Sequence, residues 1–259
     1  MNTRLADIVG RLKAPRIFVL GDLILDKYVW GSVSRISPEA PVPVVAMKSE
    51  EYRPGGASNV VTNLAALDAR VSCGGVIGRD DAGVVLQRLL RERSRTDAVI
   101  RDGEKPTSLK TRMMAHHQQM LRVDQEITAP ISAAVQSKLL AAALKAASRA
   151  DLAIISDYSK GTLPPELCQK FIRRAGCPVL VGLKGHDHRK YAKAAGASLN
   201  RTELRQLSGE DDVDRGLARI HPHALLAQRH DEEAQRELLH EPAREIGRAS
   251  CRERVFRVV

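Results

Sequence analysis

The 259-residue chain is 43% hydrophobic and 28% charged, a balance that suits one large globular domain and excludes a disordered or collagen-like chain. Its net charge is +10, but only 3% of the residues are aromatic and the Lys and Arg residues are scattered. This composition favours a solvated surface and small anionic ligands over a nucleic acid partner. Residues 1–15 lack an apolar signal core, and no run approaches the ~20 apolar residues of a membrane span. We therefore expect a cytoplasmic location and no membrane partner.

The N-terminal part of the chain predicts a buried strand, an exposed β-segment and a helix. Residues 16–20, RIFVL, form a short apolar run closed by Gly21 and Asp22, as in a parallel strand that delivers a carboxylate to its carboxyl end. Residues 28–47 alternate in polarity and carry three prolines, which indicates exposed β-structure that needs a partner sheet. Residues 55–67 begin with a glycine pair and continue at helical spacing, which predicts a loop that leads into a helix N-terminus.

The rest of the chain to about residue 181 alternates between strands and helices. A second alternating segment, residues 108–123, is expected to join the outlying sheet formed by residues 28–47. The alternation elsewhere predicts a parallel sheet with helices on both faces. The expected elements are strands at 71–77, 152–156 and 178–181, and helices at 81–93, 131–149 and 164–175.

The four cysteines show neither CxxC spacing nor the density of a disulfide framework. Free Cys is among the residue types most often buried. We expect buried free thiols rather than a metal site or disulfides at Cys73, Cys168, Cys177 and Cys251.

Polar side chains gather at one expected edge of the sheet. Asp22 and Asp157 each follow a strand, and Asn59 follows the glycine pair. Ligands bind at the carboxyl edge of open α/β sheets, where carboxylates and a carboxamide can bind the hydroxyls of a polyol. Each signal alone is weak, because an Asp after a strand is commonly a helix N-cap and a glycine pair is commonly a tight turn.

Six motifs follow one another along the chain: GDLILDKY at 21–28, SRISPEAPVPV at 34–44, RPGGASNV at 53–60, QQMLRVD at 118–124, SDYSKG at 156–161 and NRTE at 200–203. Their order and wording resemble the heptose 7-phosphate kinase family of ribokinase-like sugar kinases. The resemblance covers about residues 15–215, and the SRISPEAPVPVV run is specific to this branch, whereas GGxxN alone would indicate only a ribokinase-like protein.

The resemblance implies an α/β, ribokinase-like three-layer sandwich with a central, mostly parallel sheet and a small β-lid. It implies ATP-dependent phosphorylation of the anomeric hydroxyl of D-glycero-β-D-manno-heptose 7-phosphate, on the route to ADP-heptose for lipopolysaccharide. The outlying β-segments would form a lid that covers the sugar and pairs two subunits as a homodimer. The residues that would hold the substrate are Asp22, Gly55, Gly56, Asn59 and Asp157, with Arg112 and Arg122 for its phosphate. For each of these two arginines, ordinary exposed charge on a β-surface is an equally good interpretation.

By the same resemblance, Asn200, Arg201, Thr202 and Glu203 form an NxxE element that contacts the phosphates of ATP. Glu203 would order the hydration shell of Mg²⁺, since magnesium keeps several waters and takes few protein ligands. Lys184 belongs to a turn that matches the family's DPKG only in its second half. ATP and Mg²⁺ are therefore the expected cofactors.

The C-terminal part departs from the family. Ribokinase-like proteins take the catalytic base and the anion-binding helix terminus from a late GAGD motif, and the 259 residues contain none, so no catalytic residue is assigned. We expect residues 1–215 to form an incomplete kinase domain with lid segments at about 28–50 and 108–123. Residues 216–245 are interpreted as a degraded or frame-shifted family-like segment. Residues 246–259 are interpreted as a non-native tail, because residues 246–255 correspond to a nucleotide string used as a sequencing adapter.

Other functions stay open at this point. A second enzyme hypothesis is another ribokinase-like sugar kinase, such as one for ribose or fructose phosphate. A hypothesis of a different class is a sugar-binding, dimerising module without turnover, which the missing GAGD suggests. Nucleic acid binding ranks last.

Overall fold

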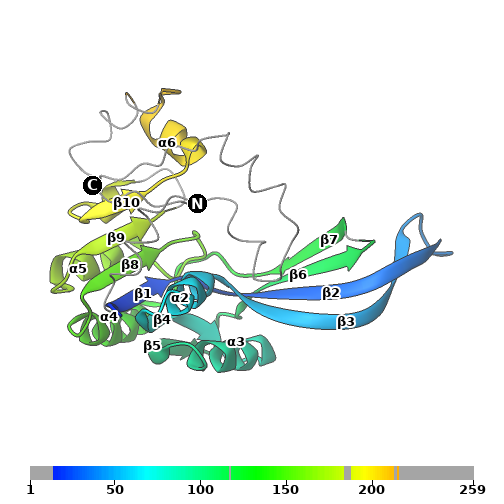
Figure 1. Ribbon diagram of the computed structural model, residues 1–259, viewed down its shortest axis with the longest axis horizontal. Helices are drawn as coiled ribbons and strands as arrows, with labels where there is room; N and C mark the ends of the chain where they lie inside the picture. Colours follow the sequence, from blue (N-terminus) through cyan, green and yellow to red (C-terminus); the bar gives the residue numbers. More distant parts are fainter. Residues whose placement is uncertain (1–13, 117, 184–187, 213–214, 216–259) are drawn as a thin grey trace.

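The computed structural model describes residues 14–116, 118–183, 188–212 and 215. Figure 1 shows two sheets: a central one wrapped by helices, and a second one that extends away from it as a long, curved ribbon. The N-terminal strands of both sheets follow one another directly along the chain.

The central sheet has six strands in the order β10-β9-β8-β1-β4-β5, and every described pair in it is parallel. Its middle strands are almost continuously apolar, as expected for strands buried on both faces. The strands are β1 (Arg16–Gly21), β4 (Arg70–Gly78), β5 (Arg95–Asp102), β8 (Leu152–Ser156), β9 (Val179–Gly182) and β10 (Gly196–Ser198).

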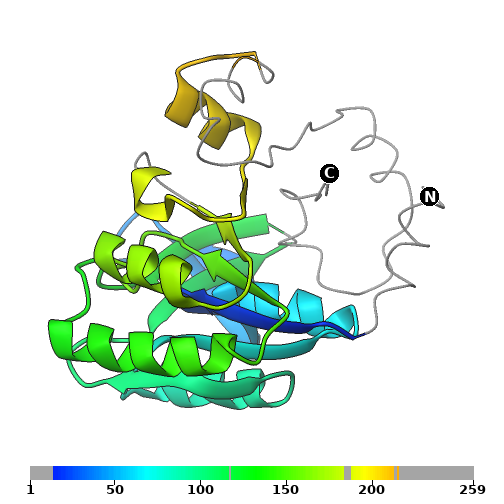
Figure 2. The ribbon, with the colours of Figure 1, turned by 90° about the vertical axis from the view of Figure 1, so that its left-hand side faces the viewer.

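Helices cover both faces of this sheet, which gives the expected three layers. One core cluster joins Phe18, Leu20 and Ile155 to helices α4 (Ala133–Ala147) and α5 (Pro165–Arg174). The other joins Ile17 and Val19 to helices α2 (Ala57–Ala66) and α3 (Asp81–Arg91). Figure 2 shows α4 and α5 stacked on one side of the strands, and a short helix, α6 (Arg201–Ser208), at the end of the sheet beyond β10.

The second sheet, which we call the lid, has four strands in the order β3-β2-β6-β7. Strand β2 (Leu23–Ile36) and strand β3 (Pro43–Gly56) form a long antiparallel hairpin, and β2 also pairs in parallel with β6 (Ser108–Ala115). Strand β7 (Gln118–Gln125) closes the sheet as an antiparallel partner of β6. The described strand residues of segments 28–50 and 108–123 thus lie in one sheet, with bends at the tip of the β2–β3 hairpin and a turn at His116.

Asp22 alone separates the two sheets along the chain, because β1 ends at Gly21 and β2 begins at Leu23. Its backbone links three segments: its N–H donates to Ser156 O at 3.2 Å, and its carbonyl accepts from Ala57 N at 3.0 Å. Gly21 is packed so closely that a Cβ there would lie 2.3 Å from Ser156 O. The junction between sheet and lid is therefore closely packed.

The strands and helices expected from the sequence are present, with small shifts at their ends. Helix α3 begins at Asp81 as expected and ends at Arg91, two residues before the predicted end, and Asp80 caps it by accepting from Gly83 N at 2.7 Å. Strand β5, the short strand β10 and helix α6 were not predicted. Cys73 and Cys168 are buried free thiols, Cys177 is partly exposed, and Cys251 lies outside the described residues.

Candidate functional site

Asp22 lies at the carboxyl edge of the central sheet and is completely buried. Its Oδ2 accepts hydrogen bonds from the backbone N–H of Tyr158 at 2.8 Å and of Lys160 at 3.1 Å, and its Oδ1 accepts from Thr162 N at 3.3 Å. Burial, and next the charge of Asp157, raise the pKa of Asp22 above its ordinary value, against the opposing effect of these hydrogen bonds. The predicted contact of Asp22 with a sugar remains a prediction, and it would require this loop to open.

Asp157 is also buried, with 2% of its surface exposed, and it holds other protein groups. Its Oδ2 accepts from the Tyr191 hydroxyl at 2.5 Å and pairs with Lys190 Nζ at 2.5 Å, while its Oδ1 accepts from Ser159 N at 2.7 Å. Burial, and next the charge of Asp157, raise the pKa of the Tyr191 phenol. Asp157 thus anchors the short 3-10 helix His188–Tyr191 in this conformation, and its contact with a sugar also remains a prediction.

A polar face of the lid brings together side chains from all four of its strands. The register places Asp26 beside Arg53 and Lys110, and places Tyr28 beside Arg112. Residues directly opposite each other in neighbouring strands point to the same face of a sheet. Arg112 Nη1 contacts Asp26 Oδ1 at 2.5 Å, with side chains 20% and 18% exposed. The guanidinium carbons of Arg53 and Arg112 lie 4.9 and 5.3 Å from the centre of the Tyr28 ring.

Arg122 completes this polar lid face, which we define as Asp26, Tyr28, Arg53, Arg112 and Arg122. Arg122 lies directly opposite Arg112 in the β6–β7 pair, is 51% exposed and contacts Asp124 through Nε at 3.0 Å. The two arginines predicted to bind a phosphate therefore share one face of the lid. Two guanidinium groups on adjacent strands suit the several oxygens of a phosphate monoester.

The glycine pair lies where the lid meets helix α2. A Cβ at Gly55 would lie 2.3 Å from Asp26 Oδ2, so the glycine makes room for that carboxylate. Gly56 has φ +55° and a Cβ there would lie 2.7 Å from Asp22 O, so it is required by both conformation and packing. Asn59, in the first turn of α2, is partly exposed. Asp26 and Gly55 are thus in direct contact where the lid meets helix α2, and the predicted contacts of Gly55, Gly56 and Asn59 with a sugar remain predictions.

The predicted nucleotide element follows the outermost strand β10 on the same carboxyl edge of the sheet, at the start of α6. Asn200 and Glu203 form a capping box: Asn200 Oδ1 accepts from Glu203 N at 2.8 Å, and Glu203 Oε2 accepts from Asn200 N at 2.9 Å. Arg201 and Thr202 are exposed beside it, whereas Glu203 is buried. The motif therefore has a structural role in this conformation, and its contact with ATP stays a prediction. Lys184 lies outside the described residues.

Magnesium fits this element only through water. The described residues contain no group of three or more His, Cys, Asp and Glu side chains arranged to hold a metal ion. Glu203 uses one carboxylate oxygen in the capping box and has the other for a water ligand of the metal, which agrees with the weak direct coordination of Mg²⁺ by proteins.

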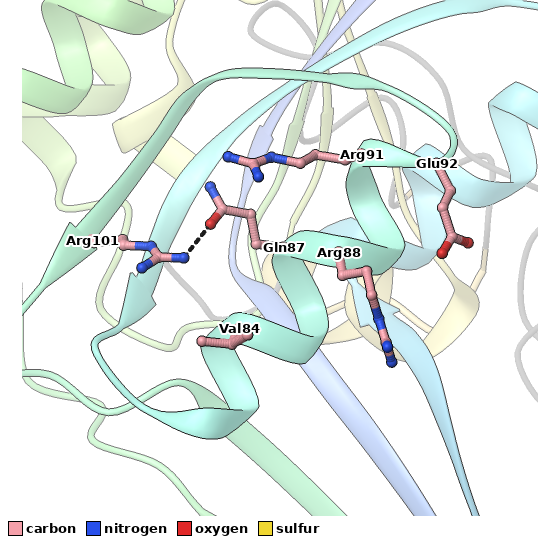
Figure 3. A pocket seen from close by; sticks show the side chains of 6 residues that line it. All are labelled: Val84, Gln87, Arg88, Arg91, Glu92 and Arg101. Carbon is pink, nitrogen blue, oxygen red and sulfur yellow. Dashed lines mark hydrogen bonds between the residues drawn. The ribbon is translucent and has the colours of Figure 1, made fainter.

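A shallow hollow of about 370 Å³ on α3 and β5 contains none of the predicted site residues. Figure 3 shows Gln87 between Arg91 and Arg101, with Gln87 Oε1 accepting from Arg101 at 2.5 Å. Arg88 and Arg91 lie in the last turn of α3, where basic side chains offset the negative end of the helix dipole. Stabilisation of the helix therefore explains the location of these two arginines, and no ligand is needed to explain it.

Sequence reasoning missed Asp26 and Arg53 as site residues, although both fall within quoted motifs. Asp26 lies four residues after Asp22, and Tyr28 follows on the same side of the strand, so the alternation of β2 carried a usable signal. The register of β2 with β6, which brings Arg112 to Asp26, is a long-range property that no local pattern reveals.

In the part of the chain that the structure describes, no helix has the length and apolar character needed to cross a membrane.

The family of pfkB carbohydrate kinases matches residues 14–230. The chain is 40% identical over 229 residues to the bifunctional protein HldE of Syntrophotalea carbinolica, which covers 87% of this chain and 47% of that protein. It is 45% identical over 206 residues to the bifunctional protein HldE of Magnetococcus marinus, covering 76% of this chain and 42% of that protein. The chain thus spans under half the length of these curated relatives.

Solved structures share the fold at low sequence identity. Arabidopsis thaliana ribokinase, solved with ribose and ATP, is 19% identical with a TM-score of 0.57, over 80% of this chain and 67% of that one. The tetrameric inhibited form of phosphofructokinase-2 from Escherichia coli is also 19% identical, with a TM-score of 0.64, over 80% of this chain and 69% of that one. These similarities show a ribokinase-like fold for the described part of the chain.

Proposed function

The chain belongs to the pfkB family of carbohydrate kinases, and from that premise we propose that its substrate is D-glycero-β-D-manno-heptose 7-phosphate, phosphorylated by MgATP at the anomeric hydroxyl. The observation that carries the proposal is the polar lid face, where two arginines lie opposite each other above a carboxylate and a glycine pair. The arginines supply donors for the 7-phosphate, and Asp26, Gly55 and Asn59 supply the surface for the sugar hydroxyls. The branch-specific residues 34–44 favour a heptose over ribose or fructose phosphate.

The nucleotide is proposed to bind on the same carboxyl edge of the sheet, beyond β10 and over the start of α6. Exposed Arg201 and Thr202 offer donors to phosphate oxygens, and Glu203 holds water of the magnesium shell. MgATP supplies the transferred phosphoryl group and charge neutralisation when bound, while the residues of this chain bind and orient the two substrates.

For the 259-residue chain itself we propose ligand binding without turnover. Phosphoryl transfer to a hydroxyl needs a base near the acceptor, and the sequence contains no GAGD to provide it. Loss of a base alone costs about 10²- to 10⁴-fold in rate, and the same motif provides the anion-binding helix terminus. An assay of ADP release with MgATP and heptose 7-phosphate tests this, and measurable turnover by the chain would refute it.

The substrate is tested by binding rather than by turnover. Isothermal titration of the chain with heptose 7-phosphate, ribose 5-phosphate and fructose 6-phosphate should give the tightest binding for the heptose. Arg112→Gln should weaken binding of heptose 7-phosphate, whereas Arg95→Gln, which removes a charge from the exposed Arg95–Asp97 pair on β5, should not. Equal binding of all three sugars would contradict the heptose assignment. Loss of binding in both variants would instead point to general electrostatics.

We also propose that the lid pairs two copies of the chain through its second face. Met113 and Leu121 are in register on the side opposite the polar lid face, with Thr111 beside Val123, while Val29 on the same side is buried at 5% exposure. Leu121 and Val123 are 57% and 49% exposed. Neighbouring exposed apolar side chains on a sheet are typical of an interface. A second copy fits best, because the same face on both subunits is self-complementary.

A further inference from the structure

The buried carboxylate of Asp22 organises the loop that follows β8. In the loop Tyr158–Thr162, Gly161 adopts φ +82° freely, but Ser159 has φ +57°, a left-handed conformation that is costly for a residue with a side chain and needs support from its surroundings. Three of its N–H groups point at Asp22. A carboxylate that accepts several backbone N–H groups forms charge-assisted hydrogen bonds, which are about twice as strong as neutral ones.

The same loop packs against the segment that leaves the lid. Residues 126–132 connect β7 to α4, and Ile131 N donates to Gly161 O at 3.1 Å. A Cβ at Gly161 would lie 2.2 Å from Ala129 O, so the backbones of loop and connection are in direct contact. Lys105 Nζ donates to Ile127 O and, at 3.0 Å, to Ala129 O. The connection is therefore fixed on both sides.

An ion-pair chain continues from the loop to the lid strands. Lys160 Nζ contacts Glu126 Oε1 at 2.5 Å, and Glu126 Oε2 contacts Lys110 Nζ on β6 at 3.1 Å. Lys110 also contacts Asp124 on β7 at 2.7 Å. These side chains are 14% to 24% exposed, so the pairs are better shielded from solvent than ordinary surface pairs.

We propose that Asp22 is a positioning residue: it fixes the loop Tyr158–Thr162, and through Lys160 and Glu126 this loop fixes the lid strands that carry Arg112 and Arg122. Asp22 thus acts on the ligand without touching it, in contrast to the direct sugar contact expected from the sequence. The part of the inference that concerns ligand affinity rests on the proposed function. The part that concerns the placement of the lid does not.

The single tryptophan of the chain allows the two parts to be tested separately. Trp30 lies on β2 in the lid, partly exposed and stacked on Tyr28 at 6.3 Å. Its fluorescence anisotropy and its quenching by acrylamide report the lid in the ligand-free chain. Asp22→Asn keeps the size of the side chain but replaces one acceptor oxygen with a donor that faces backbone N–H groups. We expect stronger quenching and lower anisotropy in Asp22→Asn and in Glu126→Gln, with no further change in the double variant, because both act through one path.

The control is Asp151→Asn, which removes the exposed pair between Asp151 and Arg16 at the amino end of the same sheet. It should leave the Trp30 signal unchanged. Lys160→Met and Lys160→Arg form a second pair that leaves the buried carboxylate in place: the first should reproduce the effect of Glu126→Gln, and the second should restore the wild-type signal. If Asp22→Asn fails to fold, the two Lys160 variants still test whether the loop positions the lid.

Titration with heptose 7-phosphate completes the test. Loss of charge-assisted hydrogen bonds in the loop should lower the affinity roughly tenfold in Asp22→Asn, with ATP affinity unchanged. An altered Trp30 signal together with no heptose binding by the wild-type chain would support the inference and refute the proposed substrate. Heptose binding by the wild type together with a Trp30 signal that neither Asp22→Asn nor Lys160→Met alters would overturn the inference. Additive effects of Asp22→Asn and Glu126→Gln would also overturn it.

Discussion

Adding one methyl group at Gly55 should damage the sugar site while sparing the fold. The new Cβ would lie 2.3 Å from Asp26 Oδ2 and 2.9 Å from its Cγ, and the nearest other atom, on Ile24, is 3.4 Å away. The strain therefore falls on the Asp26 carboxylate, which must leave its place beside Arg112. A hydrogen bond that involves a charged group is worth about 1.5–3 kcal/mol. Gly55→Ala should thus weaken heptose 7-phosphate binding by roughly 10- to 150-fold.

The stability of Gly55→Ala should change little. The side chains of the Asp26–Arg112 pair that is lost are 18% and 20% exposed, so we take its contribution as about 1 kcal/mol, the upper end of the range for surface pairs. For a chain of this size, 1 kcal/mol corresponds to about 2–4 °C in Tm. We therefore expect a fall in Tm below about 4 °C, measured by circular dichroism, together with the loss of affinity measured by calorimetry.

The adjacent glycine is the matched control. Gly56 has φ +55° and ψ −131°, and a Cβ there would lie 2.7 Å from a backbone oxygen and 2.8 Å from Ile24. Strain of this kind costs about 1–3 kcal/mol before the clash is added, so Gly56→Ala should lower Tm by more than Gly55→Ala does. Unchanged heptose affinity in Gly55→Ala, or equal losses of Tm in the two variants, would refute the role given to Asp26.

Three further predictions concern thiols, pH and assembly. Burial raises the pKa of Cys73 to about 11 and that of Cys168 to about 12, so both thiols should resist alkylation at pH 8 until the chain is denatured, as judged by mass spectrometry. Hydrogen bonds from Arg16 lower the pKa of Asp151 to about 2, so the pair stabilises the fold above about pH 4 and loses this effect as the pH falls towards 2. The Tm difference between wild type and Asp151→Asn should accordingly shrink on acidification, and a constant difference would argue against it. Leu121→Lys should convert a dimer to a monomer in light scattering, and a chain that is monomeric before the change would refute the lid interface.

The alternation of strands and helices was readable because the buried strands are strongly apolar. Residues 16–20 and 152–156 contain almost nothing but large hydrophobic side chains, and their neighbours cover both faces. Strand β5 was missed because its eight residues, RTDAVIRD, include four charged side chains, which a strand at the edge of a sheet can keep in solvent. The polarity of a short segment alone therefore does not distinguish a loop from a strand at the edge of a sheet.

The candidate site was only partly accessible from the sequence for a similar reason. The family resemblance indicated Arg112, Arg122 and the glycine pair, but whether a carboxylate faces a ligand or holds the backbone depends on contacts between distant segments. Asp22 accepts hydrogen bonds from residues 136 to 140 positions away, a structural role that no local pattern reveals, and its predicted contact with a sugar remains a prediction. The structural role of Asn200 and Glu203, in contrast, could have been read from local spacing. Their separation is also the signature of a helix capping box, which is the contact that the structure shows.

Because β2 is long, a small rotation at its junction with the central sheet produces a large displacement at its far end. From Asp22 to Ile36, fourteen steps of about 3.3 Å reach roughly 46 Å. A rotation of about 10° at Asp22 would then displace the far end by about 8 Å, but would move Tyr28 and the adjacent Arg112 by only about 3.5 Å. A ligand bound near Asp22 therefore exerts little torque on the lid, whereas a second copy bound to the outer half of the lid would exert much more. Pairing of two lids would restrict the positions of Arg112 and Arg122 more strongly than binding of the sugar.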